Sequence, residues 1–175
     1  DAYAILIFMN VSSEPRGFTI VELLIVIVVI AILASITIVA YNGIQQQARN
    51  SQVISGVNAY YKLISQYYIE QGSYPTQNGA CLGANYPDDQ CWAGQSGNRY
   101  VSAAFDAALA PYVAAKPTLA SERFSIGIGD NTRAGAVYVT SPARIIYYLQ
   151  GPTGGCVISG ASGGTEGGVV RQCAL

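Results

Sequence analysis

One carboxylate, Glu22, interrupts the longest apolar run of the sequence. The run extends from Phe18 to Tyr41, and Glu22 is its only ionisable side chain before the tyrosine. A helix over residues 18–41 rises about 36 Å, which is enough to cross a hydrocarbon core of about 30 Å. A carboxylate inside such a helix costs about 2.5 to 3.5 kcal/mol on insertion. We therefore expect Glu22 to have a function and a partner that neutralises its charge.

The second set of reactive side chains consists of four cysteines, all beyond the apolar run: Cys81, Cys91, Cys156 and Cys173. An even number of cysteines without the CxxC spacing of a metal knuckle favours disulfides over zinc. We favour the local pairs Cys81–Cys91 and Cys156–Cys173 because each bond closes a glycine-rich loop, and crossed pairing is the alternative. Disulfides predict that this part of the chain lies outside the cytoplasm.

The sequence predicts no catalytic site, metal or cofactor. It contains no histidine, which is the commonest general base and metal ligand. The glycine-rich segment 160–168 lacks the ending of a phosphate-binding loop. Asp88 and Asp89 lack the spaced oxygen ligands of a calcium loop, so calcium is only a minor alternative. With 9 basic and 10 acidic residues, the chain offers no basic patch for nucleic acid.

These residues must be positioned by a long helix. From Ile44 to Tyr67 apolar residues recur at intervals of three to five with polar residues between them, which predicts an amphipathic helix. Gly72 and Pro75 predict its end. We expect one helix over about 18–71, apolar on all sides in its first half and on one face in its second half.

The remainder of the chain predicts a small antiparallel sheet, and therefore an α+β fold. We expect a loop over 75–100, rich in glycine and proline, and a short helix over 101–109. The expected strands are 124–128, 136–140 and 144–149, with a fourth at 169–172. Turns at 129–131 and 141–142 would join the first three into a meander. The second half of the long helix would cover one face of this sheet, giving a two-layer head.

The 13 tyrosines include three adjacent pairs. These are Tyr60-Tyr61, Tyr67-Tyr68 and Tyr147-Tyr148. In each pair we expect one ring in the core and its neighbour against solvent or another subunit. This packing role is favoured over stacking on nucleic acid, which would require interleaved Arg or Lys.

The N-terminal block resembles that of a type IV pilin, in the wider type IV filament family that includes secretion pseudopilins. The resemblance rests on Gly17-Phe18-Thr19, on Glu22 and on the apolar run 23–39. It extends more loosely to Gly72-Ser73-Tyr74-Pro75 and to the late cysteine pair. This sequence departs from many pilins at Ala31 and Val39, where they have Gly and Pro, and at the acidic Glu14 of the leader.

The resemblance implies a processing and assembly mechanism. A prepilin peptidase of the membrane would cleave between Gly17 and Phe18 and methylate the new amine of Phe18. In the filament, Glu22 would form a salt bridge with the Phe18 amine of a neighbouring subunit, which would neutralise the carboxylate. The predicted parts are then a leader (1–17), a membrane-spanning and assembly helix (18–41) and a head (42–175). Residues 1–8 precede Met9, which we expect to be the true start; the alternative is that these eight residues are a genuine extension of the chain.

The function implied by the resemblance is structural and not enzymatic. The chain would be a single-pass protein of the cytoplasmic membrane and then the subunit of a homo-oligomeric extracellular pilus for motility, adhesion or DNA uptake. Its partners would be the prepilin peptidase and the assembly machinery, with DNA as an unsupported alternative. The alternatives to a major pilin are a type II secretion pseudopilin, a minor tip subunit for adhesion or DNA uptake, and a plain membrane anchor.

Overall fold

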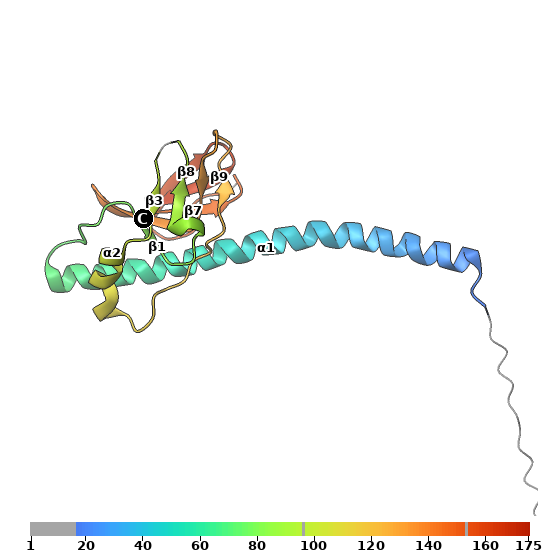
Figure 1. Cartoon of the computed structure of the whole chain (residues 1–175), viewed down its shortest axis with the longest axis horizontal. Coiled ribbons are helices and arrows are strands. Elements are labelled where there is room, and N and C mark those ends of the chain that lie inside the picture. Colours follow the sequence, from blue (N-terminus) through green and yellow to red (C-terminus); the bar gives the residue numbers. More distant parts are fainter. Residues whose placement is uncertain (1–16, 96, 153) are drawn as a thin grey trace, which may run out of the picture. The chain divides into compact units, whose positions relative to one another are not determined.

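The longest element of the computed structural model is helix α1, Ile20–Gln71, of 52 residues (Figure 1). The structure describes residues 17–95, 97–152 and 154–175. Apart from Gly17, the expected leader lies outside these residues. The helix ends where the sequence predicts, because Gly72 has a φ of 70° and its N–H donates to the Tyr68 carbonyl at 2.9 Å. The chain divides into two compact units between Asn42 and Gly43.

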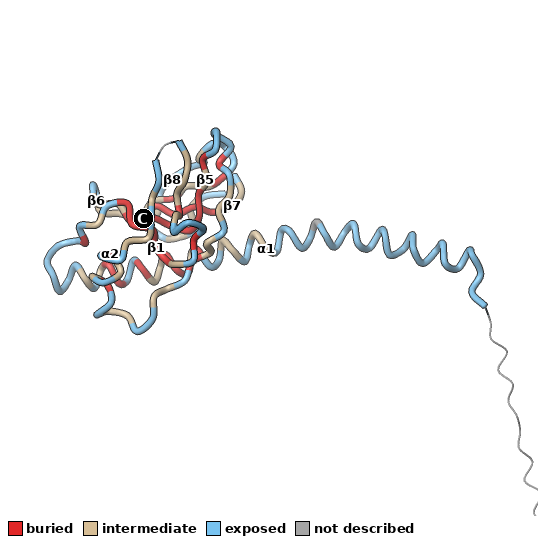
Figure 2. The backbone as a smooth tube through the Cα atoms, in the orientation of Figure 1, coloured by how far each residue is buried: buried red, intermediate tan, exposed pale blue. Residues whose placement is uncertain are grey.

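In the first unit, α1 carries apolar side chains on every side. All residues from Ile20 to Ile38 are exposed (Figure 2). The hydroxyls of Ser35 and Thr37 donate to the carbonyls of Ile32 and Ala34, at 2.7 and 2.9 Å, so their polar groups are bonded within the helix. This segment therefore presents an apolar surface without a core of its own.

In the second unit, the main element is a five-stranded antiparallel sheet in the order β1-β6-β7-β9-β8. Its strands are β1 (Ala80–Leu82), β6 (Ala136–Thr140), β7 (Ala143–Gln150), β8 (Ser162–Glu166) and β9 (Val170–Ala174).

The second half of α1 packs against one face of this sheet. Val57 and Tyr60 of the helix share a buried cluster with Tyr138, Tyr147 and Leu149 of the sheet. A helix stripe on a sheet face is one of the stable ways to bury both apolar surfaces. The predicted α+β fold, with a long helix on an antiparallel sheet, is confirmed.

The other face of the sheet is covered as well, which the sequence does not predict. A four-stranded sheet, in the order β3-β2-β5-β4, lies against it. Its strands are β2 (Gln90–Ala93), β3 (Arg99–Tyr100), β4 (Phe124–Ser125) and β5 (Thr132–Arg133). The head has three layers, and the prediction of two layers is wrong.

Because of this second sheet, two segments differ from their predicted structure. The expected loop 75–100 contains β1, β2, β3 and a single 3₁₀ turn, η1 (Pro87–Asp89), because Leu82 and Cys91 are buried and their backbone groups need partners. The expected strand 124–128 shortens to β4 and joins the second sheet, since Gly127 turns the chain with a φ of 77°. The predicted turns at 129–131 and 141–142 are present, joining β4 to β5 and β6 to β7.

The predicted short helix is present as α2, Ala103–Leu109, followed by a 3₁₀ turn, η2 (Ala110–Tyr112). The hydroxyl of Ser102 caps it by accepting the Phe105 N–H at 3.2 Å. Phe105 and Leu109 are buried, so the i, i+4 pair faces the core as expected.

The tyrosine pairs on α1 follow the prediction, whereas the pair on β7 does not. Tyr60 is buried and Tyr61 is exposed, but Tyr147 and Tyr148 are both buried. Successive strand residues point to opposite faces, and each face of β7 is covered by another layer. Tyr147 faces the α1 side, and Tyr148 lies edge-on to Trp92 on the second-sheet side.

A buried arginine joins the two sheets. The guanidinium of Arg133, on β5, lies 3.9 Å from the ring centroid of Trp92 and 2.7 Å from Glu166 Oε1 on β8. Both a ring face and a carboxylate therefore compensate its burial.

The four cysteines form the local pairs that the sequence favours. Cys81 and Cys91 are bonded, as are Cys156 and Cys173. The first bond ties β1 to β2, and so joins the two sheets. The second fastens the segment before β8 to β9, where glycines provide little packing.

Candidate functional site

Glu22 closes the first turn of α1. Its Oε2 accepts hydrogen bonds from the backbone N–H and the hydroxyl of Thr19, both at 2.8 Å, and its own N–H donates to Thr19 Oγ1 at 3.2 Å. This reciprocal arrangement is a capping box, which satisfies N–H groups that a helix start otherwise leaves unbonded. A carboxylate is also favoured there by the helix dipole. Glu22 thus has partners within its own chain.

This cap is missing from the expectations drawn from the sequence, which give Glu22 a partner only in a neighbouring subunit. The signal is nevertheless present, because Thr or Ser followed three residues later by Glu or Asp before an apolar run is a known helix start. The helix accordingly begins at Ile20 rather than at Phe18.

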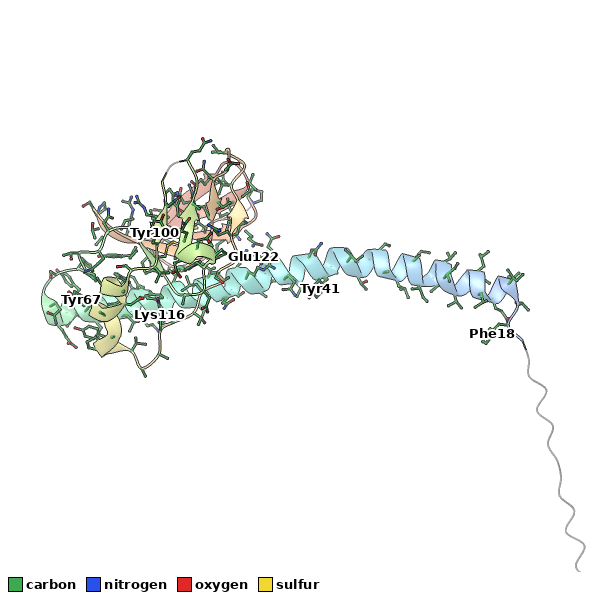
Figure 3. The ribbon with its side chains drawn as sticks, viewed as in Figure 1. Phe18, Tyr41, Tyr67, Tyr100, Lys116 and Glu122 are labelled. Carbon is green, nitrogen blue, oxygen red and sulfur yellow. A yellow bond between two sulfur atoms is a disulfide. The ribbon has the colours of Figure 1, made fainter. Side chains whose placement is uncertain are left out.

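Gly17 and Phe18 precede the helix and belong to no regular element. The side chain of Phe18 is 81% exposed (Figure 3), and nothing lies within 4 Å of the position that a Cβ on Gly17 would take. Within the described residues, the peptide bond between them is therefore sterically open. It lies one residue before Thr19, whose N–H and hydroxyl hold Glu22, so a new amine on Phe18 would form next to the helix cap.

The surface that follows this site is built for an apolar environment. Among the described residues, α1 is the one helix that is long and apolar enough to cross a membrane. Its polar side chains between Ile20 and Ile38 are Glu22, Ser35 and Thr37, and each is hydrogen-bonded to its own helix or cap.

A family model described as the prokaryotic N-terminal methylation motif matches residues 14–38, which include Gly17, Phe18 and Glu22. The type IV major pilin protein PilE1 of Neisseria gonorrhoeae is 32% identical over 78 residues, which are 45% of this chain and 47% of its own length. The chain is therefore similar to type IV pilins over somewhat less than half of its length, and it carries the N-terminal methylation motif. Pilins are structural proteins and not enzymes.

Two further relatives are a fimbrial protein and a protein of a secretion system. The fimbrial protein EcpC of Eikenella corrodens is 35% identical over 69 residues, covering 39% of this chain and 45% of the relative. The type II secretion system core protein G of Escherichia coli K12 is 31% identical over 70 residues, covering 40% and 48%. The chain spans about half the length of the curated relatives it matches, and these relatives include both pilins and a secretion-system protein. No solved structure matches the chain.

The described acidic residues of the head do not gather into a metal site. No group of three or more His, Cys, Asp or Glu side chains that could hold an ion occurs in the described part of the chain. The carboxylate of Asp88 is instead paired with Arg123 Nη2 at 3.1 Å, so it stabilises the turn before β2.

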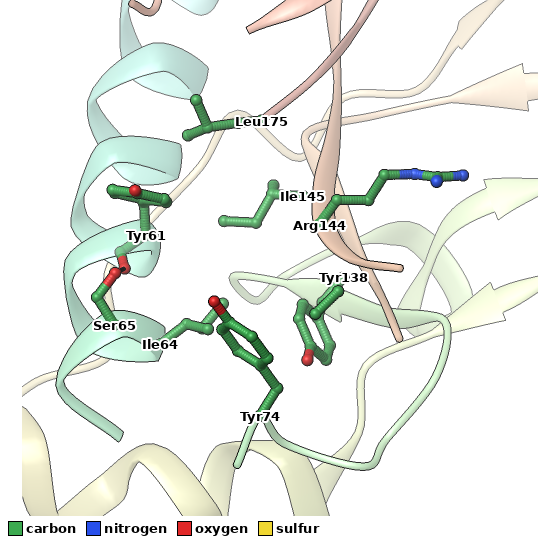
Figure 4. Close-up of a pocket in the computed structure, with 9 residues that line it drawn as sticks. Tyr61, Ile64, Ser65, Tyr74, Tyr138, Arg144, Ile145 and Leu175 are labelled. Atoms are coloured by element: carbon green, nitrogen blue, oxygen red, sulfur yellow. Dashed lines mark hydrogen bonds between the residues drawn. The ribbon is translucent and has the colours of Figure 1, made fainter. Parts of the chain in front are cut away.

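A pocket of about 120 Å³ lies between α1 and β7 of the head (Figure 4). Tyr61, Tyr74 and Tyr138 line it together with Ile64 and Ile145. The hydroxyl of Tyr138 donates to the Pro75 carbonyl at 2.9 Å. Burial raises the pKa of Tyr138 to about 12. Besides the tyrosines, Ser65 and Arg144, the side chains that line the pocket are apolar.

Proposed function

We propose that this chain is the structural subunit of a type IV pilus. The precursor is stored in the cytoplasmic membrane as a leader (1–17), a membrane-spanning helix (18–41) and an exported head (42–175). A prepilin peptidase cleaves it between Gly17 and Phe18 and methylates the Phe18 amine. The mature chain then polymerises through its apolar helix into an extracellular filament.

The observation that carries this proposal is the exposed apolar surface from Ile20 to Ile38. Soluble monomers rarely expose contiguous apolar surface of more than a few hundred Å². A helix that is apolar all round is at home in lipid or among other helices. A subunit that moves from membrane to filament meets both environments in turn.

The position of Glu22 supports a switch at the cleaved bond. In the uncleaved chain, Thr19 provides the hydrogen bonds to Glu22. Cleavage adds a cation at Phe18, one residue before Thr19, so the carboxylate gains the option of a charged partner on a neighbouring subunit. An ion pair in low dielectric offsets much of the cost of desolvating each charge alone, and we propose that this pair fixes the axial register of the filament.

The test is the identity of the chain in surface filaments. Filaments sheared from cells that express the full gene are purified, and the subunit is measured by intact mass and N-terminal peptide mapping. The expected main component begins at Phe18 and carries one N-terminal methyl group. Filaments in which this chain is absent, or in which it retains Gly17, would refute the proposal.

The second candidate is a secretion pseudopilin, which the similarity to the type II secretion core protein G favours. A pseudopilin filament would be short and would remain within the envelope. The same shearing experiment separates the two, because a pseudopilin stays with the cells while secretion fails in its absence. A minor tip pilin, for adhesion or DNA uptake, would appear in the sheared filaments at only a small fraction of the main subunit.

A further inference from the structure

A pocket of about 290 Å³ lies in the head between the first turns of its part of α1, from Gly43 to Asn50, and the sheet. Its lining includes Gly43, Gln46, Gln47 and Asn50 on α1, and Gln150 and Arg171 on the sheet. The pilus function proposed above does not use it.

The walls of this pocket are held by a defined set of hydrogen bonds. The Gln150 carbonyl accepts from Gln46 Nε2 at 2.8 Å and from Asn50 Nδ2 at 3.1 Å, and the Gln150 N–H donates to Asn50 Oδ1 at 2.8 Å. Gly151 completes the wall, because a Cβ at this position would lie 2.6 Å from Gln46 Nε2. These bonds hold Gln46 and Asn50 in place against Gln150.

Arg171 is the charged residue of the pocket. Its Nη1 donates to the Gly155 carbonyl at 3.1 Å, but its Nε is buried without a hydrogen-bond partner in the described part of the chain. Arg171 takes part in none of the ion pairs among the described residues, and no carboxylate side chain lines the pocket. A partly buried guanidinium without an anion is costly, and its planar donors match phosphate.

The chain itself limits which phosphate can reach this arginine. Gly43 follows Tyr41, the end of the apolar run, by two residues, and two residues of chain span at most about 7 Å. The headgroup layer of a bilayer is about 5 to 8 Å thick on each side of the hydrocarbon core. When 18–41 spans the membrane, the entrance of the pocket is within reach of the lipid phosphates.

We propose that this pocket binds the phosphate of an anionic membrane lipid in the stored precursor, with Arg171 as its main ligand. The amide of Gln47 and the edge of the pocket at Gly43 face the same space and accommodate the glycerol side of the headgroup. The inference rests on the proposed membrane-stored precursor. It adds a lipid partner for the head that the filament proposal does not require.

The test is an NMR titration of the full chain in neutral detergent micelles. The Nε–H resonance of Arg171 is followed while phosphatidylglycerol is added to the micelles, and inorganic phosphate is added to a parallel sample at the same phosphate concentration. We expect a saturable shift with the lipid and little change with inorganic phosphate. Arg171→Gln should weaken lipid binding at least about tenfold, measured on the amide resonances of Gln46 and Gln47.

The matched control is Lys62→Gln, which removes an exposed cation of α1 outside the pocket and should leave the affinity unchanged. No saturable shift in the wild-type chain, or equal affinity in Arg171→Gln, would overturn the proposal. Equal shifts with inorganic phosphate would also overturn it, since the site would then bind a free anion. The wild-type titration uses the unassembled chain, so it can succeed even where filament formation fails.

Discussion

The two halves of helix α1 are both rich in apolar residues, yet their surroundings are opposite. From Ile20 to Ile38 every side chain is exposed, whereas Val53, Val57 and Leu63 are buried under the head's own sheet. The second half has polar residues between its apolar ones, so one stripe suffices to bury it. The first half has no polar face. An apolar stripe can be buried within the chain, whereas a helix that is apolar all round needs lipid or other subunits.

The largest expected difference between the halves comes from removing the same side chain in each. Leu63→Ala should lower the free energy of unfolding of the head by about 2 to 5 kcal/mol, because it leaves a cavity beneath the sheet. Leu33→Ala, its matched control in the exposed half, should change head stability by less than about 0.5 kcal/mol. Thermal unfolding of the full chains in detergent, followed by near-UV circular dichroism, measures both. Equal losses would contradict the division of the helix.

The second difference concerns the covalent closure of the head. Replacing Cys156 and Cys173 together by serine should cost about 3 kcal/mol of head stability, since the bond closes a loop between residues 17 apart in sequence. Membrane insertion of the apolar half should be unaffected. Unfolding curves and membrane fractionation of the same variant test the two statements, and a loss of insertion would show that the halves are coupled.

A smaller effect is expected at the helix start. Thr19→Ala removes the two hydroxyl bonds of the capping box but leaves the backbone N–H bond to Glu22, and it should destabilise the first turn by about 1 kcal/mol. Thr19→Ser should retain most of the cap. Hydrogen exchange of the amides of Val21 and Glu22 reports on this turn. Unchanged exchange in Thr19→Ala would mean that the capping box does not hold the turn in solution.

The smallest effect at neutral pH concerns the buried tyrosines of the head. Burial raises the pKa of Tyr60 and of Tyr138 to about 12, above the usual value near 10. The unfolded chain therefore releases these protons first, so head stability is fully present below pH 10 and falls as the pH rises towards 12. Absorbance at 295 nm and circular dichroism should change together in this range. Ionisation of all tyrosines without unfolding would contradict the burial.

The sequence predicts the parts of the molecule that have long periodic signals. The helix from the apolar run to Gly72, the strands around Val137 and Ile146, and the local disulfides all follow from pattern, turn residues and spacing. The second sheet does not, because β4 and β5 hold two residues each and two residues carry no periodicity. Its anchor, Arg133 between Trp92 and Glu166, depends on contacts distant in sequence.

The candidate site was predictable to a similar degree. Gly17, Phe18 and Glu22 follow from residue type and order, and the Thr19 cap was available as a short motif. Only the structure reveals that Glu22 is already hydrogen-bonded in the uncleaved chain. The carboxylate is therefore a capped charge and not an unpaired one, and we propose that it exchanges partners on assembly.

The role of the Glu22 charge in assembly is tested by comparing filament yield and membrane content between Glu22→Gln and the wild-type chain. The variant can keep the bond to the Thr19 N–H but loses the charge that the Phe18 amine requires. We predict normal amounts of the chain in the membrane, normal cleavage after Gly17, and a fall of at least about tenfold in sheared filaments. Filaments at wild-type yield from Glu22→Gln would show that assembly does not need the charge of Glu22.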